Sequence, residues 1–185
     1  MNKFLSQFVT ERLTAGGGAN GDGTVFTINT NGTGFQTLVS FSGSNGGNPF
    51  GSLTLIGSTL YGVTEYGGAN SGGTVFSLPV SGGTVTTMLS LSFFTNGENP
   101  FGSLTLGGST LYGTARQGGV NGDGTVFSIP IGGGTATTLL SFSGTDGTWP
   151  QGSLILSGST LYGMTRLGGT NGDGNIFSLN TDGSG

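Results

Sequence analysis

A phrase of about 50 residues recurs along the chain, and this repeat constrains the fold more than any other feature. The clearest copy comprises Gly51–Gly62 (GSLTLIGSTLYG) and Gly67–Phe76 (GGANSGGTVF). Two further copies and one partial copy follow the same pattern: Gly102–Gly113 with Gly118–Phe127, Gly152–Gly163 with Gly168–Phe177, and Gly17–Phe26. Because each repeat is one structural unit that packs on its neighbours, the array is expected to form a single domain.

The composition excludes several function classes. The 185 residues include no Cys and no His, so disulfides, thiol nucleophiles, histidine bases and the usual zinc sites are ruled out. Only 6% of residues are charged and the net charge is −4, which argues against nucleic acid as a partner. No stretch is apolar enough to predict a membrane span. Apolar residues recur at fixed places, which favours an ordered, turn-rich β protein over disorder.

Each complete repeat predicts four short strands separated by turns. Gly57-Ser58, and the equivalent Gly-Ser pairs at 108–109 and 158–159, are typical of two-residue hairpin turns. Pro79 and Pro130 cannot donate to a strand ladder and are expected near strand ends. The predicted strands are 24–29 and 36–42, then 52–56, 59–64, 74–80 and 85–92, then 103–106, 110–115, 125–131 and 136–143, and finally 153–156, 160–165 and 175–180.

Residues 1–14 stand outside this pattern and admit two interpretations. The spacing of Phe4, Phe8 and their apolar neighbours fits a short amphipathic helix. Alternatively, Leu13 and Thr14 occupy the place of Val63 and the threonine after it, which predicts a strand that could be exchanged between chains. The strand is the favoured interpretation. Beyond this segment the expected domain contains a partial unit 15–48, units 49–99 and 100–149, and a partial unit 150–185.

A period of about 50 residues with four strands is typical of a propeller blade. The predicted fold is therefore all-β, a β-propeller-like array of four-stranded antiparallel blades with about 3.5 repeats. An open arc of blades would expose a backbone edge and the face of a terminal blade. Two chains could close one ring, the front strand could join a neighbour and extend a filament, or the sequence could be part of a longer protein.

The repeated motifs resemble known families. The order of a hairpin ending in Leu60-Tyr61-Gly62, a Gly-Gly pair at 67–68 and two further strands is similar to Kelch repeats. The phrases Leu-Tyr-Gly-x-Thr, Gly-Gly-x-Asn-x-x-Gly-Thr-Val-Phe and Leu-x-Ser-Phe-x-Gly-x-x-Gly-x-x-Pro resemble the GloVer tandem repeat. That resemblance covers the chain from about residue 14 onward. It implies a bacterial, exported propeller-like array, placed outside the cell or on its surface.

One set of equivalent positions changes chemistry from copy to copy. Glu65, Arg116 and Arg166 follow the tyrosine strand at corresponding places, with Tyr66 beside the first, and are expected on one rim of the blades. A variable rim on a constant frame is where a propeller would bind a glycan or protein ligand. Trp149, the single tryptophan, corresponds to Asn48 and Asn99 and is expected in a loop as a candidate sugar platform; the alternative is that all these residues are solvated loop tips.

The acidic loops suggest a weaker hypothesis. Asp22, Asp123 and Asp173 lie in Asn-Gly-Asp-Gly sequences before the third strand, where oxygen ligands could hold Ca²⁺. Each loop offers a single carboxylate, and the copy at 70–73 has none. We therefore favour a turn in which Asn, Asp and Gly stabilise the local backbone, and expect no cofactor.

The remaining repeated residues predict a core and little catalysis. Six aromatic residues are assigned to packing between blades: Tyr61, Phe76, Tyr112, Phe127, Tyr162 and Phe177. Without His or Cys, no nucleophile–base pair can be assembled. The favoured function is a non-catalytic, self-assembling surface scaffold or binding ring. The alternatives are a carbohydrate-active enzyme whose acids meet at the central channel, and a fibre subunit joined by strand donation.

Overall fold

The computed structural model describes residues 9–185, in which every regular element is a β-strand. The first sheet contains β1 (Val9–Thr14), β2 (Thr24–Asn29) and β3 (Gln36–Ser40). The second contains β4 (Gly47–Ile56), β5 (Thr59–Tyr66), β6 (Thr74–Pro79) and β7 (Thr86–Ser90). The third contains β8 (Glu98–Pro100), β9 (Thr105–Gly107), β10 (Thr110–Gln117), β11 (Thr125–Pro130) and β12 (Thr137–Ser141). The fourth contains β13 (Thr148–Pro150), β14 (Ile155–Ser157), β15 (Thr160–Leu167) and β16 (Ile176–Asn180).

Each sheet is one antiparallel blade whose strands pair in chain order. In the third blade, β8 and β9 both pair with β10 and together take the place of the single strand β4. In the fourth blade, β13 and β14 pair with β15 in the same way. With β13 and β14 counted as one strand position, two blades with all four positions are flanked by two blades with three, which confirms the predicted all-β, propeller-like array. β6 and β11 end at Pro79 and Pro130, as predicted.

The strand β1 holds the second position of the first blade. It pairs with β2 so that Thr14 faces Thr24, just as Thr64 in β5 faces Thr74 in β6. Residues 9–14 therefore adopt the strand that was favoured over a helix. The rest of the N-terminal segment, residues 1–8, lies outside the described residues.

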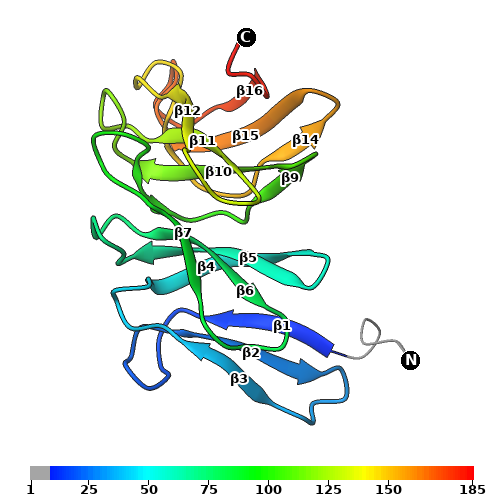
Figure 1. The fold of residues 1–185 in the computed structure, drawn as a ribbon. Coiled ribbons are helices and arrows are strands. Elements are labelled where there is room, and N and C mark those ends of the chain that lie inside the picture. Colours follow the sequence, from blue (N-terminus) through cyan, green and yellow to red (C-terminus); the bar gives the residue numbers. More distant parts are fainter. Residues whose placement is uncertain (1–8) are drawn as a thin grey trace.

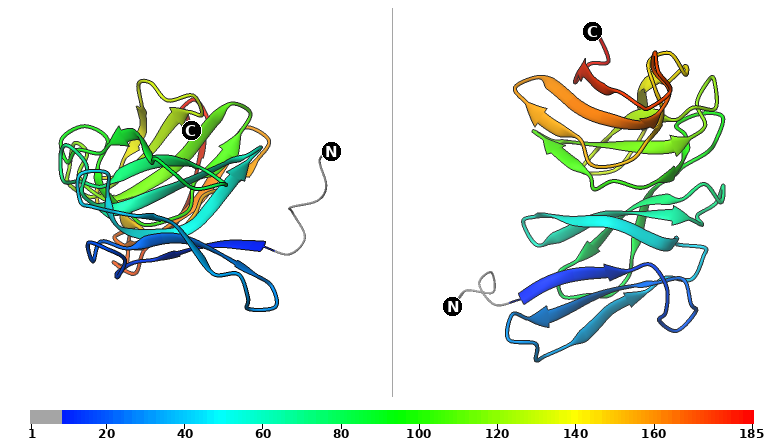
Figure 2. Two further views of the ribbon diagram at one scale, coloured as in Figure 1. Left: turned by 60° about the horizontal axis from the view of Figure 1, so that its bottom comes forward. Right: turned by 180° about the vertical axis from the view of Figure 1, so that it is seen from behind.

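The four blades lie one on the next in chain order, from β1–β3 at one end to β13–β16 at the other (Figures 1 and 2). The first strand of each blade packs against the second strand of the blade before it. Equivalent threonine hydroxyls join the first strand of one blade to the next blade. Thr54 Oγ1 donates to the carbonyl of Leu104 over 2.7 Å, and Thr105 Oγ1 donates to that of Leu154 over 2.6 Å. The first strand of each later blade therefore joins that blade to the one before it.

The hydrophobic core consists of three layers, one between each pair of neighbouring blades. Of the predicted core residues, Tyr61, Phe76, Tyr112 and Phe127 are buried, and Phe177 is half-buried against the third layer. Burying one such side chain contributes roughly 1.5–3 kcal/mol. Because each layer repeats the same contacts, packing between blades is the main source of stability for the array.

Tyr162 was wrongly assigned to the core. Its exposed fraction is 43%, against 8% for Tyr61 and 6% for Tyr112 at the equivalent positions. The reason is its place in the fourth blade, on a face that no blade of the described chain covers. Met164 and Ile176 lie on the same face and are 60% and 82% exposed.

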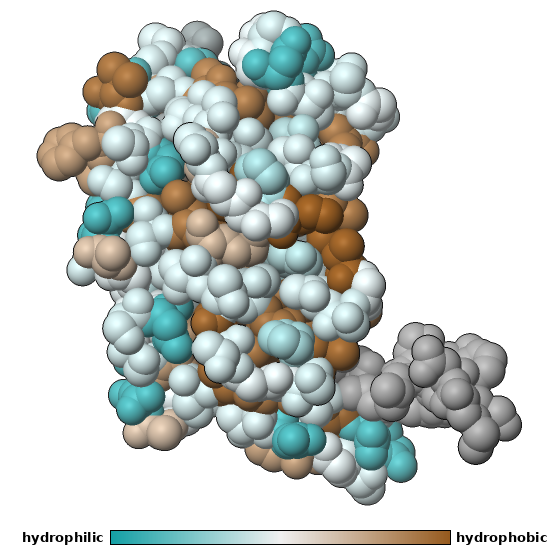
Figure 3. All heavy atoms as spheres, viewed as in Figure 1, coloured by the Kyte–Doolittle hydropathy of each residue, from teal (hydrophilic) through white to brown (hydrophobic). Residues whose placement is uncertain are grey.

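The surface is mostly pale on the hydropathy scale, because Gly, Ser and Thr supply much of it (Figure 3). Strongly hydrophilic side chains are sparse on this face. In the described part of the chain, no helix has the length and apolar character needed to cross a membrane.

Candidate functional site

In the second, third and fourth blades the second strand is longer than predicted. β5, β10 and β15 continue to residues 66, 117 and 167, because this end of the strand still pairs with β4, β8 and β13 respectively. Glu65, Arg116 and Arg166 are therefore the penultimate residues of strands and not loop residues. They remain at equivalent positions on one rim of successive blades, as expected.

Trp149 lies at the centre of the short strand β13 and not in a loop, because the residues on either side of it, Thr148 and Pro150, pair with β15. The Trp149 side chain is half-buried. Its backbone N–H donates to the carbonyl of Asp123 over 2.9 Å. The equivalent Asn48 and Asn99 make the same bond to the preceding blade, over 2.8 and 2.9 Å. This position thus ties each blade to its predecessor.

The backbone at this position is left-handed in all three copies. The φ angles are 54° for Asn48, 56° for Asn99 and 56° for Trp149. Asparagine visits this region readily, whereas a bulky side chain there costs about 1–2 kcal/mol. Strain of this kind is typical of functional sites. Trp149 is therefore a residue whose presence the fold alone does not favour.

Two guanidinium groups lie over the Trp149 ring. The Cζ atom of Arg116 is 4.7 Å from the ring centroid, and that of Arg166 is 5.8 Å from it. Each cation–π contact contributes about 0.5–1 kcal/mol where solvent is present. Within residues 9–185 neither arginine forms an ion pair with a carboxylate, and the buried Nε of Arg116 has no hydrogen-bond partner.

A second polar group adjoins the arginines. Glu65 is 5% exposed and its carboxylate accepts a hydrogen bond from Asn48 Nδ2, while Asn99 Nδ2 donates to the Glu65 carbonyl over 3.2 Å. The pKa of Tyr66 is raised, first by its hydrogen bond with the Glu65 side chain, then by burial and by the negative charge of Glu65. The positive charge of Arg116 acts on Tyr66 in the opposite direction, so the two groups share one electrostatic environment.

We refer to these residues together as the rim cluster, which comprises Asn48, Glu65, Tyr66, Arg116, Trp149 and Arg166. The structure places Arg116, Trp149 and Arg166 in contact across the third and fourth blades. Glu65 and Tyr66 adjoin them on the second blade. Sequence reasoning missed the role of Asn48 and Asn99 as partners of Glu65. The available signal was their alignment with Trp149.

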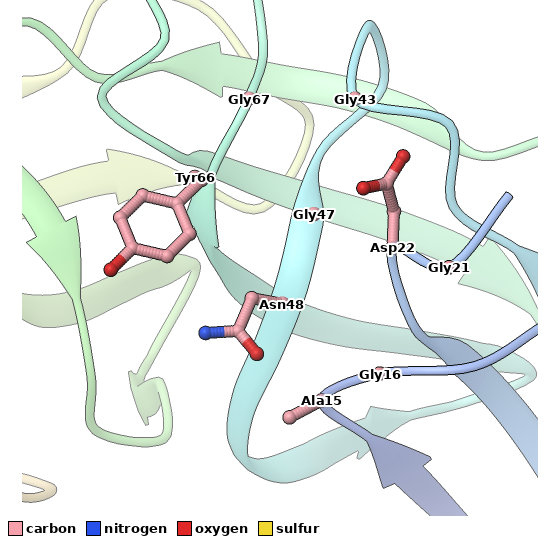
Figure 4. Close-up of a pocket in the computed structure, with 9 residues that line it drawn as sticks. All are labelled: Ala15, Gly16, Gly21, Asp22, Gly43, Gly47, Asn48, Tyr66 and Gly67. Carbon is pink, nitrogen blue, oxygen red and sulfur yellow. The ribbon is translucent and has the colours of Figure 1, made fainter.

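A pocket of about 350 Å³ opens on the same rim between the first and second blades. Its polar side chains are those of Asp22, Asn48 and Tyr66. Figure 4 shows Tyr66 and Asn48 on one side of β4 and the Asp22 carboxylate on the other, with Gly47 between them. The pocket therefore extends the rim cluster toward the first blade.

The acidic loops are held together by backbone groups. In the third blade the N–H of Gly124 donates to the carbonyl of Gly118 over 3.0 Å, and Asn121 Nδ2 donates to the carbonyl of Phe142 over 2.9 Å. A side chain at position 124 would collide with Pro150 Cδ at 2.5 Å. The copy without an acid keeps the equivalent bond, from Gly73 to Gly67 over 3.1 Å, so the turn does not require the carboxylate.

The acidic side chains are dispersed. In residues 9–185 no three His, Cys, Asp or Glu residues gather into a group able to hold a metal ion. Asp22, Asp123 and Asp173 lie in separate turns of three different blades. The chemistry that the rim offers is therefore recognition by cations, amides, a phenol and an indole.

Four-stranded antiparallel blades stacked in chain order define a β-propeller-type repeat protein. The chain belongs to the Gloeobacter/Verrucomicrobia repeat family, whose model matches residues 12–177. This confirms the family predicted from the motifs. No curated protein matches the chain.

Solved structures show the same fold at low sequence identity. The chain is similar to a protein in the crystal structure of a nidogen/laminin complex, with a TM-score of 0.64 and 15% identity over 95% of this chain and 57% of that one. It is similar to a putative TolB from Agrobacterium tumefaciens, with a TM-score of 0.61 and 11% identity over 96% and 59%. A gluconolactonase from Xanthomonas campestris gives 0.58 and 15% over 87% and 53%. The chain thus spans somewhat more than half the length of these proteins.

Proposed function

We propose that this protein is a non-catalytic propeller-type module of a bacterial protein exported to the cell surface, where it binds a glycan at the rim cluster. The observation that carries the proposal is Trp149, a strained tryptophan placed where the other blades have asparagine. The frame holds this position in every copy through the same backbone hydrogen bond. A strained aromatic residue that brings the fold little net stability is better explained by ligand binding than by folding.

Binding is favoured over catalysis because of where the acids lie. Glycoside hydrolysis needs two carboxylates about 5–9.5 Å apart on either side of the substrate bond. The repeated aspartates instead lie in separate turns, and the buried Glu65 is already engaged by Asn48 and Tyr66. The gluconolactonase shares only the fold with this chain, so it carries no argument for that activity here.

The uncovered face of the fourth blade, which we call the terminal face, supports self-assembly as part of the same proposal. Tyr162, Met164 and Ile176 are exposed on the fourth blade, whereas their equivalents Tyr112, Thr114 and Val126 on the third blade are covered by the blade that follows. Between the third and fourth blades, the equivalent face is covered by apolar side chains of the blade that follows. We therefore propose a second copy of this chain as its occupant. Light scattering over a dilution series tests this; a stable mass above that of one chain is expected, and a monomer at every concentration contradicts it.

A glycan array tests the binding proposal. The wild-type protein and the Trp149→Asn variant are applied to immobilised glycans under the same conditions. Asparagine occupies this position in two other blades, so the variant keeps the frame. We expect at least one glycan to retain the wild type and to lose the variant. Equal retention of both proteins, or retention of neither, overturns the proposal.

A further inference from the structure

We infer that Arg116 and Arg166, whose guanidinium groups lie over the Trp149 ring, bind the carboxylate of an acidic saccharide. This inference rests on the proposed glycan-binding function and names the class of glycan. We call the three residues the arginine–tryptophan site. They come from two neighbouring blades, with Arg116 on β10 and the other two on β13 and β15.

Neither guanidinium group is held in an ion pair by the described residues, although the buried Glu65 carboxylate belongs to the same rim cluster. In the described part of the chain no carboxylate forms an ion pair with either of them. Burial leaves the Nε–H of Arg116 without any acceptor. Buried donors are nearly always paired in native structures, so an unpaired one marks a place where an acceptor is missing. An incoming anion would bind the other N–H groups of the two guanidinium groups and neutralise the local positive charge.

The position of the two guanidinium groups over the ring suits a carboxylate. A guanidinium that lies over an aromatic ring keeps its N–H groups in its own plane, where they stay available to an acceptor. Its donors form a planar fork that matches the two oxygens of a carboxylate. Trp149 would therefore act as a support that holds Arg116 and Arg166 in place, and not as an open platform on which a sugar ring stacks.

The surroundings favour one carboxylate over a polyanion. The whole chain carries a net charge of −4, which repels a long polyanion along most of its surface. Asp123 lies on the loop whose carbonyl accepts the Trp149 N–H. At physiological salt, charges are screened over about 8 Å, so the positive field of the two arginines stays local.

The neighbours of the arginines favour a saccharide as the carrier of the carboxylate. The phenol of Tyr66 lies within the field of Arg116, and Tyr66 is 51% exposed. Neutral amides and hydroxyls are suitable partners for sugar hydroxyls.

The test uses the fluorescence of Trp149, the single tryptophan of the chain. The protein is titrated with oligosaccharides that carry a single terminal galacturonate and, in parallel, with the neutral galactose-terminated oligosaccharides of the same length. The variants are Arg116→Gln and Arg166→Gln. The control is Arg12→Gln, which changes the net charge equally on the exposed surface of the first blade. Circular dichroism and thermal unfolding show that each variant is folded.

We expect the acidic sugar to change the fluorescence of the wild type and the neutral sugar to bind at least about ten-fold more weakly. Each arginine substitution should weaken the acidic sugar by about ten-fold or more, while Arg12→Gln leaves it unchanged. Arg166 is exposed, so its variant remains informative if Arg116→Gln fails to fold. Equal affinity for the two sugars, unchanged affinity in Arg166→Gln, or no binding of the acidic sugar overturns the inference.

Two failures are distinguishable. If the glycan array yields a neutral glycan that requires Trp149 but neither arginine, the inference is wrong and the proposed function stands. If no glycan requires Trp149, both are wrong.

Discussion

The Cζ atom of Arg116 lies 4.7 Å from the centre of the Trp149 ring, although the two residues belong to neighbouring blades. Arg166 approaches the same ring at 5.8 Å. The equivalents of these residues elsewhere are Glu65 in one case and Asn48 and Asn99 in the other. A few substitutions on a repeated frame have thus assembled a cationic site at a single junction between blades.

Replacing Trp149 by Asn should leave stability within about 1 kcal/mol of the wild type. Asparagine tolerates the left-handed backbone better than tryptophan, which is expected to gain about 1–2 kcal/mol. The lost cation–π contacts cost about 0.5–1 kcal/mol each, so the two effects nearly cancel. Urea unfolding followed by circular dichroism measures the difference, because the variant has no tryptophan left to follow.

The reverse change, Asn99→Trp, is the matched control for that prediction. It places an indole on the same left-handed backbone and removes the hydrogen bond from Asn99 Nδ2 to the Glu65 carbonyl. A loss of about 2–3 kcal/mol is expected from the strain and the lost bond together. If Trp149→Asn destabilised the protein as much as Asn99→Trp, the assignment of strain to Trp149 would be wrong.

Gly113→Ala should destabilise the protein by about 1–3 kcal/mol, as is usual for overpacking of a core. A Cβ at this position would lie 2.6 Å from Cζ of Phe127 and 3.1 Å from Cδ2 of Leu104, in the layer between the second and third blades. Gly132→Ala is the control, because a Cβ there meets nothing within 4 Å. Equal melting temperatures for the two variants would show that the blades are not packed as described.

Substitutions at two equivalent positions, one buried and one exposed, distinguish an effect on stability from an effect on assembly. Val126 is fully buried between the third and fourth blades, while Ile176 is 82% exposed on the terminal face. Val126→Thr should cost about 1–3 kcal/mol by burying a hydroxyl, whereas Ile176→Thr should change stability by no more than about 0.5 kcal/mol. Light scattering should nevertheless show weaker association for Ile176→Thr. Unchanged association would mean that this face does not hold a second copy.

Much of the frame could be predicted from the sequence, because its signals are local and repeated. Residues 24–29 form the predicted strand with identical ends, and the hairpin at Gly57 and the strand ends at Pro79 and Pro130 follow from turn and proline chemistry. Repetition strengthens these signals, since equivalent positions can be compared in several copies within one chain.

The start of the first strand in the second, third and fourth blades could not be predicted, because its sequence resembles a turn. Pro150 and the left-handed Trp149 beside it indicate a loop by themselves. Pairing with β15 across the blade nevertheless makes this segment a strand. The exposure of Tyr162 was missed for a related reason: its sequence context is that of buried Tyr61 and Tyr112, and only the position of its blade differs.

The stability of the protein should fall as the pH rises above 10. The hydrogen bond to Glu65 is the main cause of the raised pKa of Tyr66, whose ordinary value is 10.0. The folded phenol therefore keeps its proton at a pH where the unfolded one loses it, and the stabilisation present below the ordinary pKa is lost above it. Tyr66→Phe should flatten this part of the pH profile of unfolding.

Glu65→Gln provides the second arm of the pH experiment. Without the carboxylate, the pKa of Tyr66 should move down toward its ordinary value. Ultraviolet absorbance of tyrosinate, with Tyr66→Phe subtracted to remove the other tyrosines, measures the shift. A Tyr66 titration that is the same in both backgrounds would contradict the contact between Glu65 and Tyr66.

Quenching of Trp149 fluorescence by iodide and by caesium tests the central claim most directly, because it reports the charge next to the ring without any assumed ligand. Two unpaired arginines at the ring should draw iodide in and repel caesium. We predict stronger quenching by iodide in the wild type, with the difference lost in the Arg116→Gln/Arg166→Gln double variant. Stronger quenching by caesium, or a preference for iodide that survives the double substitution, would contradict a cationic site at Trp149.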